Sequence, residues 1–139
     1  MKTLIAFSTT HGCTEKTSQE LKEYFDGEVE LINLKSDRNP KLEKFNRVII
    51  GGSIHAGQVQ KRVKEFCSKN INELKLKELG LFICCMEPGE TGQKQLLDAY
   101  PEELHQVAKS VAVFGGEFDF EKMNFLEKIV VKKVAKVKK

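Results

Sequence analysis

Long apolar runs are missing from this chain of 139 residues. No stretch approaches the ~18 consecutive apolar residues of a membrane-spanning helix. The apolar run in MKTLIAFS is too short for a secretory signal and lacks a small-residue cleavage site. The net charge is only +3, with the excess lysine at the C-terminal end, which argues against nucleic acid as a partner. We therefore expect a cytoplasmic protein that binds no nucleic acid.

Paired metal-ligand motifs are missing as well. The chain has four cysteines, at Cys13, Cys67, Cys84 and Cys85. None stands at Cys-x-x-Cys spacing, and no histidine lies near them at ligand spacing, so we expect reduced thiols and no metal site. Cys13 begins a predicted helix, a position that can make a thiol reactive. No second thiol stands near it in the sequence, so a redox role for its side chain is the less favoured interpretation.

The composition and the apolar pattern together predict one α/β domain over residues 1–139. Hydrophobic residues make up 40% of the chain, which excludes a disordered composition. Segments typical of strands are found at residues 2–7, 28–34, 46–52, 79–85 and 110–114. Most of them are continuously apolar, as in a parallel sheet covered on both faces. We therefore predict a three-layer, doubly wound sheet of five parallel strands.

Helical spacing of apolar residues separates these strands. It predicts helices over residues 14–25, 58–74 and 91–109, the last interrupted at Tyr100 and Pro101. In that last segment we expect four apolar side chains to face the sheet, namely Leu96, Leu97, Leu104 and Val107. Ligands of such folds bind beyond the carboxyl ends of the strands, where the strand order reverses.

The first strand leads into a loop suited to a phosphate group. Its hydroxyl-bearing residues are Ser8, Thr9, Thr10 and Thr14, and Gly12 lets the backbone come close to a ligand. A helix beginning there directs N–H groups at the same place. Ser and Thr also cap helices, but one cap does not need four hydroxyls. No Lys or Arg lies between Lys2 and Lys16, so neutral donors would hold the phosphate, which favours a monophosphate. The spacing is neither that of a P-loop nor of a dinucleotide fingerprint.

Other loops at the same edge suit a flat aromatic ligand. The loop GGSIHAG has three glycines, Gly51, Gly52 and Gly57, which we expect to give backbone flexibility, and one polar ring, His55. Direct ligand contact by His55 and a solvent-facing position remain equal alternatives. A further loop starts at Met86, where Pro88 and Gly89 prevent regular structure.

These motifs resemble those of the flavodoxin family over residues 1–120. The patterns F-S-T-x-x-G-x-T and G-x-S-I-x-x-G are more closely similar to flavodoxin-like menaquinone-dependent protoporphyrinogen oxidases. The resemblance implies strand order 2-1-3-4-5 and bound FMN. Its phosphate would be held by Ser8, Thr9, Thr10, His11, Gly12, Cys13 and Thr14. Its ring would be flanked by Ser53, Ile54, His55, Ala56, Gly57, Met86, Glu87 and Pro88.

The resemblance implies a redox protein that transfers electrons through bound FMN to a partner protein or a quinone. The alternative is an FMN-dependent oxidase that passes electrons from protoporphyrinogen to menaquinone. A receiver-like signalling domain is set aside, because Gly51 stands where that class needs an Asp. The catalytic residues are unknown, since His11, His55 and Glu87 are all titratable and the spacing selects none. The chain lacks Trp, so we expect FMN binding without aromatic stacking from the flavin loops.

The C-terminal segment, residues 120–139, has the pattern of a basic amphipathic helix, because valine, isoleucine and phenylalanine alternate with lysine. One interpretation is that it closes the sheet and exposes its lysines to solvent. The other is a peripheral contact with anionic lipid at the inner face of the membrane, where a quinone would be met.

Overall fold

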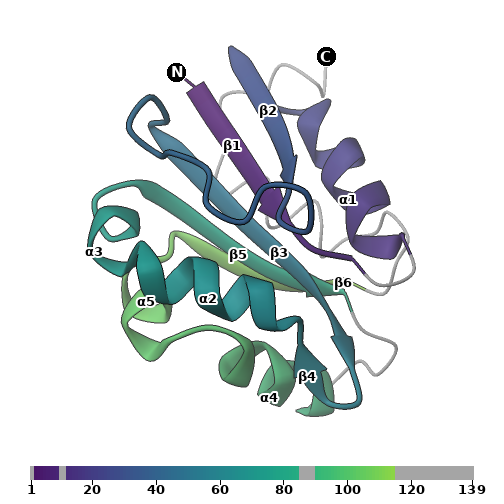
Figure 1. Ribbon diagram of the computed structural model, residues 1–139. Helices are drawn as coiled ribbons and strands as arrows, with labels where there is room; N and C mark the ends of the chain where they lie inside the picture. The colour runs from purple at the N-terminus through teal and green to yellow at the C-terminus, as the bar shows by residue number, and fades with distance from the viewer. Residues whose placement is uncertain (1, 10–11, 85–89, 115–139) are drawn as a thin grey trace.

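A sheet of parallel strands organises the computed structural model, which describes residues 2–9, 12–84 and 90–114. The parallel strands are β1 (Lys2–Phe7), β2 (Glu28–Asn33), β3 (Arg47–His55), β5 (Glu78–Cys84) and β6 (Ser110–Phe114). They lie in the order β2-β1-β3-β5-β6 (Figure 1). Numbered among the parallel strands alone, this is the predicted order 2-1-3-4-5, so the predicted fold class is confirmed.

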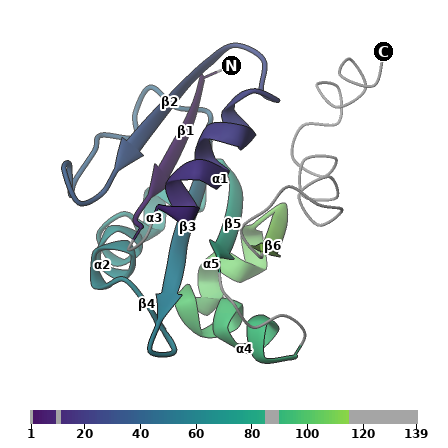
Figure 2. The same cartoon turned by 90° about the vertical axis from the view of Figure 1, so that its right-hand side faces the viewer.

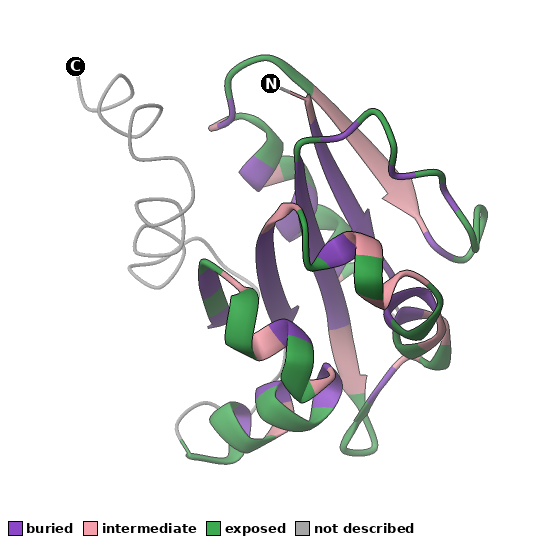
Figure 3. Ribbon diagram, turned by 90° about the vertical axis from the view of Figure 1, so that its left-hand side faces the viewer, coloured by how far each residue is buried: buried purple, intermediate pink, exposed green. Residues whose placement is uncertain are grey.

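Helices cover both faces of this sheet (Figure 2). On one face α1 (Cys13–Lys22) places Leu21 against Ile5 and Phe82. The other face is covered by α2 (Lys61–Lys69), α3 (Ile71–Leu74), α4 (Glu90–Ala99) and α5 (Glu102–Val107). The inner strands β1, β3 and β5 are almost wholly buried between these layers, whereas β2 at the edge is only half-buried (Figure 3). Continuous apolar runs therefore mark the strands that are covered twice.

The segment 58–74 was predicted as one helix, and this prediction is wrong in two places. Residues Gln58–Val59 form a short strand, β4, which pairs antiparallel with the end of β3. The helix then breaks at Asn70, whose backbone and side-chain amides both donate to the carbonyl of Phe66. This side chain ends α2 by competing for its last carbonyl groups.

Two inward-facing predictions for the segment 91–109 are also wrong. Leu96 and Leu104 are buried as expected, but Leu97 is 62% exposed and Val107 is 39% exposed. The predicted helix is two helices, so the faces of α4 and α5 do not continue one another. Leu97 instead lines a hollow of about 440 Å³ with residues of α5.

Tyr100 joins these two helices to the sheet. Its ring is 3% exposed, and its hydroxyl lies 2.6 Å from the carbonyl oxygen of Phe82 and 3.1 Å from that of Ile50. One hydroxyl proton is shared between two acceptors of neighbouring strands. Burial raises the pKa of Tyr100 well above its usual range, so the hydroxyl stays protonated and continues to donate.

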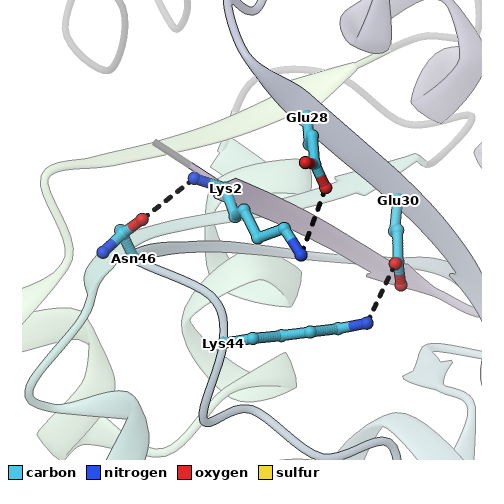
Figure 4. Close-up of polar contacts among 5 residues, drawn as sticks. All are labelled: Lys2, Glu28, Glu30, Lys44 and Asn46. Carbon is cyan, nitrogen blue, oxygen red and sulfur yellow. Dashed lines mark hydrogen bonds and ion pairs between the residues drawn. The ribbon is translucent and has the colours of Figure 1, made fainter.

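Charged side chains surround the amino end of β1 and its neighbour β2 (Figure 4). Lys2 Nζ lies 3.1 Å from Glu28 Oε2, and Lys44 Nζ lies 3.1 Å from Glu30 Oε1. The amide of Lys2 donates to Asn46 Oδ1 at 2.9 Å. These exposed ion pairs contribute at most about 1 kcal/mol each, but charges on an edge strand also discourage pairing with another chain.

In the described ranges, the helices are too short and too polar to cross a membrane. The segment 120–139, for which an amphipathic helix was predicted, lies outside the described residues.

Candidate functional site

The first two predicted loops begin at the carboxyl edge of the sheet. The amide of Ser8, directly after β1, donates to the carbonyl of Gly51 in β3 at 3.1 Å. Ser53 near the end of β3 is paired in register with Cys84 at the end of β5. Segments that are far apart in the sequence are therefore neighbours here. Thr10, His11, Met86, Glu87 and Pro88 lie outside the described residues.

The first loop turns into α1 through a left-handed glycine. Gly12 has φ 87° and ψ −9°, and its amide donates to Thr9 Oγ1 at 2.8 Å. The carbonyl of Gly12 accepts from the amide of Lys16 at 3.0 Å, which closes the first helical turn. Gly12 is the N-cap residue and has no side chain to cap the helix. The first N–H groups of α1 thus keep the arrangement that binds anions at helix N-termini.

A buried hydroxyl without a strong partner lies at this helix start. Thr14 is 0% exposed, and its Oγ1 makes no hydrogen bond of good geometry within the described part of the chain. Its one described neighbour of this kind is the Cys84 thiol, a weak partner whose pKa the Thr14 hydroxyl slightly lowers. Leaving a buried polar group unsatisfied costs about 1–3 kcal/mol, so such groups call for an explanation. A phosphate oxygen held by the helix start would be an acceptor for this hydroxyl. Among the described members of the predicted phosphate set, Thr14 is therefore the one whose surroundings best fit such a group.

A cation that the sequence reasoning missed lies against the same loop. Arg62 Nη1, in the first turn of α2, donates to Ser8 Oγ at 3.0 Å. The loop itself contains no Lys or Arg, and Arg62 comes 54 positions later in the chain. Only the packing of α2 on the sheet brings its guanidinium to the end of β1, and no local motif signals this.

The second predicted loop is largely regular structure. Ser53, Ile54 and His55 continue β3 and form a hairpin with β4 through Ala56 and Gly57. Those two residues have φ 52° and 77°, the backbone of a two-residue type I′ turn. The expectation of an irregular loop was wrong, because strand pairing with β4 supplies partners for this backbone. His55 is exposed at the hairpin end.

Gln60, a second residue missed from the sequence, fixes Ser53 within this hairpin. Its Oε1 accepts from the Ser53 amide at 3.1 Å, and its Nε2 donates to Ser53 Oγ at 2.6 Å. Gln60 also directly precedes α2. The start of α2 therefore holds both candidate loops, the first through Arg62 and the second through Gln60.

The strand glycines serve close packing and not flexibility. A Cβ on Gly51 would lie 2.1 Å from Phe82 Cζ, and one on Gly52 would lie 2.4 Å from Val59 Cγ2. Of the three glycines expected to give flexibility, only Gly57 adopts positive φ. The prediction of flexibility at Gly51 and Gly52 is wrong, because both lie in a regular strand.

Comparison with known proteins decides the family. A family model described as a flavodoxin domain matches residues 4–139. The chain belongs to the flavodoxin domain family. This flavodoxin-domain chain is 33% identical over 81 residues to the protoporphyrinogen IX dehydrogenase [quinone] of Escherichia coli K12. That match covers 53% of this chain and 42% of the relative, which is less than half of the relative's length.

Two solved flavodoxin structures share the fold. Oxidised flavodoxin 1 from Bacillus cereus aligns with a TM-score of 0.64 and 16% identity, over 98% of each chain. A Fusobacterium nucleatum flavodoxin variant bound to flavin mononucleotide aligns with a TM-score of 0.51 and 18% identity, over 79% of this chain and 66% of its own. At this level of identity the likeness concerns the fold.

Two thiols lie together below the site of this flavodoxin domain. Cys84 donates a weak hydrogen bond to Thr17 Oγ1 at 3.6 Å, and the half-buried Cys13 packs against the same apolar cluster. Burial raises the pKa of Cys84 to about 12. The Thr17 hydroxyl, and to a smaller extent the Thr14 hydroxyl, oppose this rise, and the Cys13 thiol adds to it. A second thiol therefore stands near Cys13 in space, although none does in the sequence.

We expect the described cysteines to differ strongly in reactivity. Burial raises the pKa of Cys67 to about 12, as for Cys84, so at pH 8 only about one in ten thousand of either thiol is ionised. At this pH iodoacetamide should label Cys13 first. Labelling of the two buried thiols should rise about tenfold per pH unit, since thiolate is the reactive form.

Tandem mass spectrometry of a labelling time course measures each cysteine separately and distinguishes Cys84 from its neighbour Cys85. Full labelling in urea is the control for access. If native Cys67 reacts as fast as Cys13, the packing described around α2 is wrong.

Proposed function

We propose that this protein binds FMN and transfers electrons through the bound flavin. The observation that carries the proposal is the buried Thr14 hydroxyl, which has no strong hydrogen-bond partner and lies at a helix start of the kind that binds anions. The match to the flavodoxin domain and the FMN-bound flavodoxin of similar fold support the choice of cofactor. Bound flavin would supply the electron chemistry, and the protein would tune it through contacts near the ring.

The residues of this chain would bind and orient the cofactor. Ser8–Thr14 would hold the phosphate through hydroxyl and backbone donors, and Ser53–Gly57 would lie beside the ring, with Met86–Pro88 completing its surroundings. The Gln60 side chain fixes Ser53, so the hairpin would offer the ring a preformed edge and not a mobile loop. The proposal includes no residue of this chain as a general acid or a general base.

The partner would be a redox protein or a quinone. The likeness to a quinone-dependent protoporphyrinogen dehydrogenase favours a second candidate, oxidation of protoporphyrinogen with electrons passing to menaquinone. We further propose one domain over residues 1–139, located in the cytoplasm. The segment 120–139 would be a basic amphipathic helix that closes the sheet, with peripheral contact with the membrane as the alternative.

FMN titration of the purified protein tests the cofactor proposal. Binding should quench flavin fluorescence and leave yellow protein with one FMN per chain after removal of the excess. Flavin that washes off at micromolar protein would contradict the proposal. If FMN is retained, an assay with protoporphyrinogen and menadione separates the two candidates, since only the oxidase should form protoporphyrin faster than free FMN does.

The substitution Thr14→Val tests the hydroxyl that carries the proposal. Valine keeps the shape of threonine and removes an oxygen whose described neighbour, the Cys84 thiol, is only a weak partner, so the stability of the ligand-free protein should stay the same or rise. Hydrogen bonds to charged groups contribute about 1.5–3 kcal/mol, so FMN should bind at least about tenfold more weakly.

Thermal melts without ligand and fluorescence titrations measure the two effects of Thr14→Val separately. Ser18→Ala is a matched control, because the Ser18 hydroxyl already donates to the Thr14 carbonyl at 2.8 Å and is not a candidate ligand. The assignment fails if Thr14→Val binds FMN as tightly as the unchanged protein.

A further inference from the structure

Arg62 occupies an unusual position for a cation. It is half-buried in the first turn of α2, and among the described residues its side chain donates a hydrogen bond to the fully buried Ser8. The first turn of α2 contains no acidic residue. Cations are unfavourable at helix N-termini, where the macrodipole is positive, so the helix itself does not favour this charge.

The guanidinium also lacks a counter-charge in the described part of the chain. The ion pairs of the described residues are formed by lysines and by Arg47, and not by Arg62. The buried Arg47, for comparison, has Nη2 3.8 Å from Oε2 of Glu78. Ser8 is a neutral acceptor and takes only one of the five N–H groups of Arg62. Buried and half-buried charges are usually paired. An anionic ligand at the loop would be the missing partner.

The loop needs such a charge if it holds a phosphate monoester. That group carries a charge approaching −2 at neutral pH, whereas a helix N-terminus supplies the equivalent of only about half a positive charge. The Thr14 hydroxyl, which has no strong partner, independently indicates an acceptor at this loop. Arg62 donates a hydrogen bond to Ser8, which is the first residue of the proposed phosphate loop.

We propose that Arg62 is a phosphate-binding residue that selects a flavin carrying a phosphate monoester over unphosphorylated flavin. This inference rests on the proposed FMN binding. Ser8 would orient the guanidinium, and the planar N–H groups left over would contact the phosphate oxygens. The competing explanation is structural, with Arg62 merely tying α2 to the end of β1.

Paired titrations with FMN and riboflavin test this proposal. Arg62→Gln should weaken FMN binding by roughly tenfold and leave riboflavin binding unchanged, because only FMN carries the charge. The salt dependence of FMN binding should fall in the same variant. Arg62→Lys should retain part of the preference, because it keeps the charge but loses the fork of donors. Lys61→Gln removes the same charge from the exposed neighbouring position, so it should change neither affinity.

Each outcome decides the question. Equal loss of FMN and riboflavin binding, or no loss of either, in Arg62→Gln would overturn the phosphate role while leaving the proposed function intact. If the unchanged protein binds neither flavin, both proposals fail. Should Arg62→Gln not fold, the FMN and riboflavin affinities of Arg62→Lys decide, since a merely structural role would not change their ratio.

Discussion

Replacing Gly51 with alanine is expected to lower the free energy of unfolding by about 3 kcal/mol or more. The new Cβ would lie 2.1 Å from Cζ of Phe82 and within 2.6 Å of both neighbouring ring carbons. The Phe82 ring is 0% exposed and packs 5.5 Å from the Phe114 ring, centroid to centroid. The ring has no space into which to withdraw, so the strand or the core must shift. Urea denaturation followed by circular dichroism measures the change.

Two further variants separate crowding from other effects at Gly51. Gly57→Ala places a Cβ in open space at φ 77°, so only backbone strain of about 1 kcal/mol should appear. Adding Phe82→Leu to Gly51→Ala should make the double variant more stable than the sum of the two single changes predicts. Near-native stability of Gly51→Ala would show that β3 and β5 are not packed as described.

Replacing Phe66 with alanine is expected to destabilise the protein by about 3–5 kcal/mol. Phe66 is among the largest side chains that are fully buried, and it belongs to the core cluster between α2 and the sheet. Truncation leaves a cavity that the surrounding strands can fill only in part. Because α2 also positions Gln60 and Arg62, FMN binding should weaken together with stability.

The matched control for Phe66→Ala is Leu76→Ala, at a leucine that is 86% exposed. Its stability should stay within about 0.5 kcal/mol of the unchanged protein. Denaturant midpoints and slopes of both variants provide the comparison. A loss below about 1 kcal/mol at Phe66 would show that α2 does not form the core layer assigned to it.

The sheet could be predicted from the sequence because its inner strands are marked by unbroken apolar runs. Residues 110–114, for example, were expected as a strand, and β6 has the same bounds. The hairpin at Ala56 and Gly57 was missed, since glycines suggested a loop and β4 has only two residues. Leu97 was misplaced because helical spacing alone cannot show that α4 and α5 lie along different axes.

The candidate site could be predicted only where its residues are close together in the sequence. Gly12 and Thr14 could be picked out because a strand, a hydroxyl-rich turn and a helix follow one another directly. Arg62 could not, because its meeting with Ser8 depends on how α2 packs. The same holds for the nearness of Cys13 and Cys84, which depends on how α1 packs against β5.

The position of β1 between β2 and β3 has a consequence for folding during synthesis. Residues Lys2–Phe7 leave the ribosome before their ladder partners, which are residues 28–33 on one side and 47–51 on the other. This inner strand must therefore wait until residue 51 has been made before both of its edges are paired. Parallel pairing of this kind is intrinsically slow, because the chain loses the entropy of loop closure before the strand contacts stabilise it. Until Gly51 has emerged, LIAF of the nascent chain is an exposed apolar segment of the kind that chaperones bind.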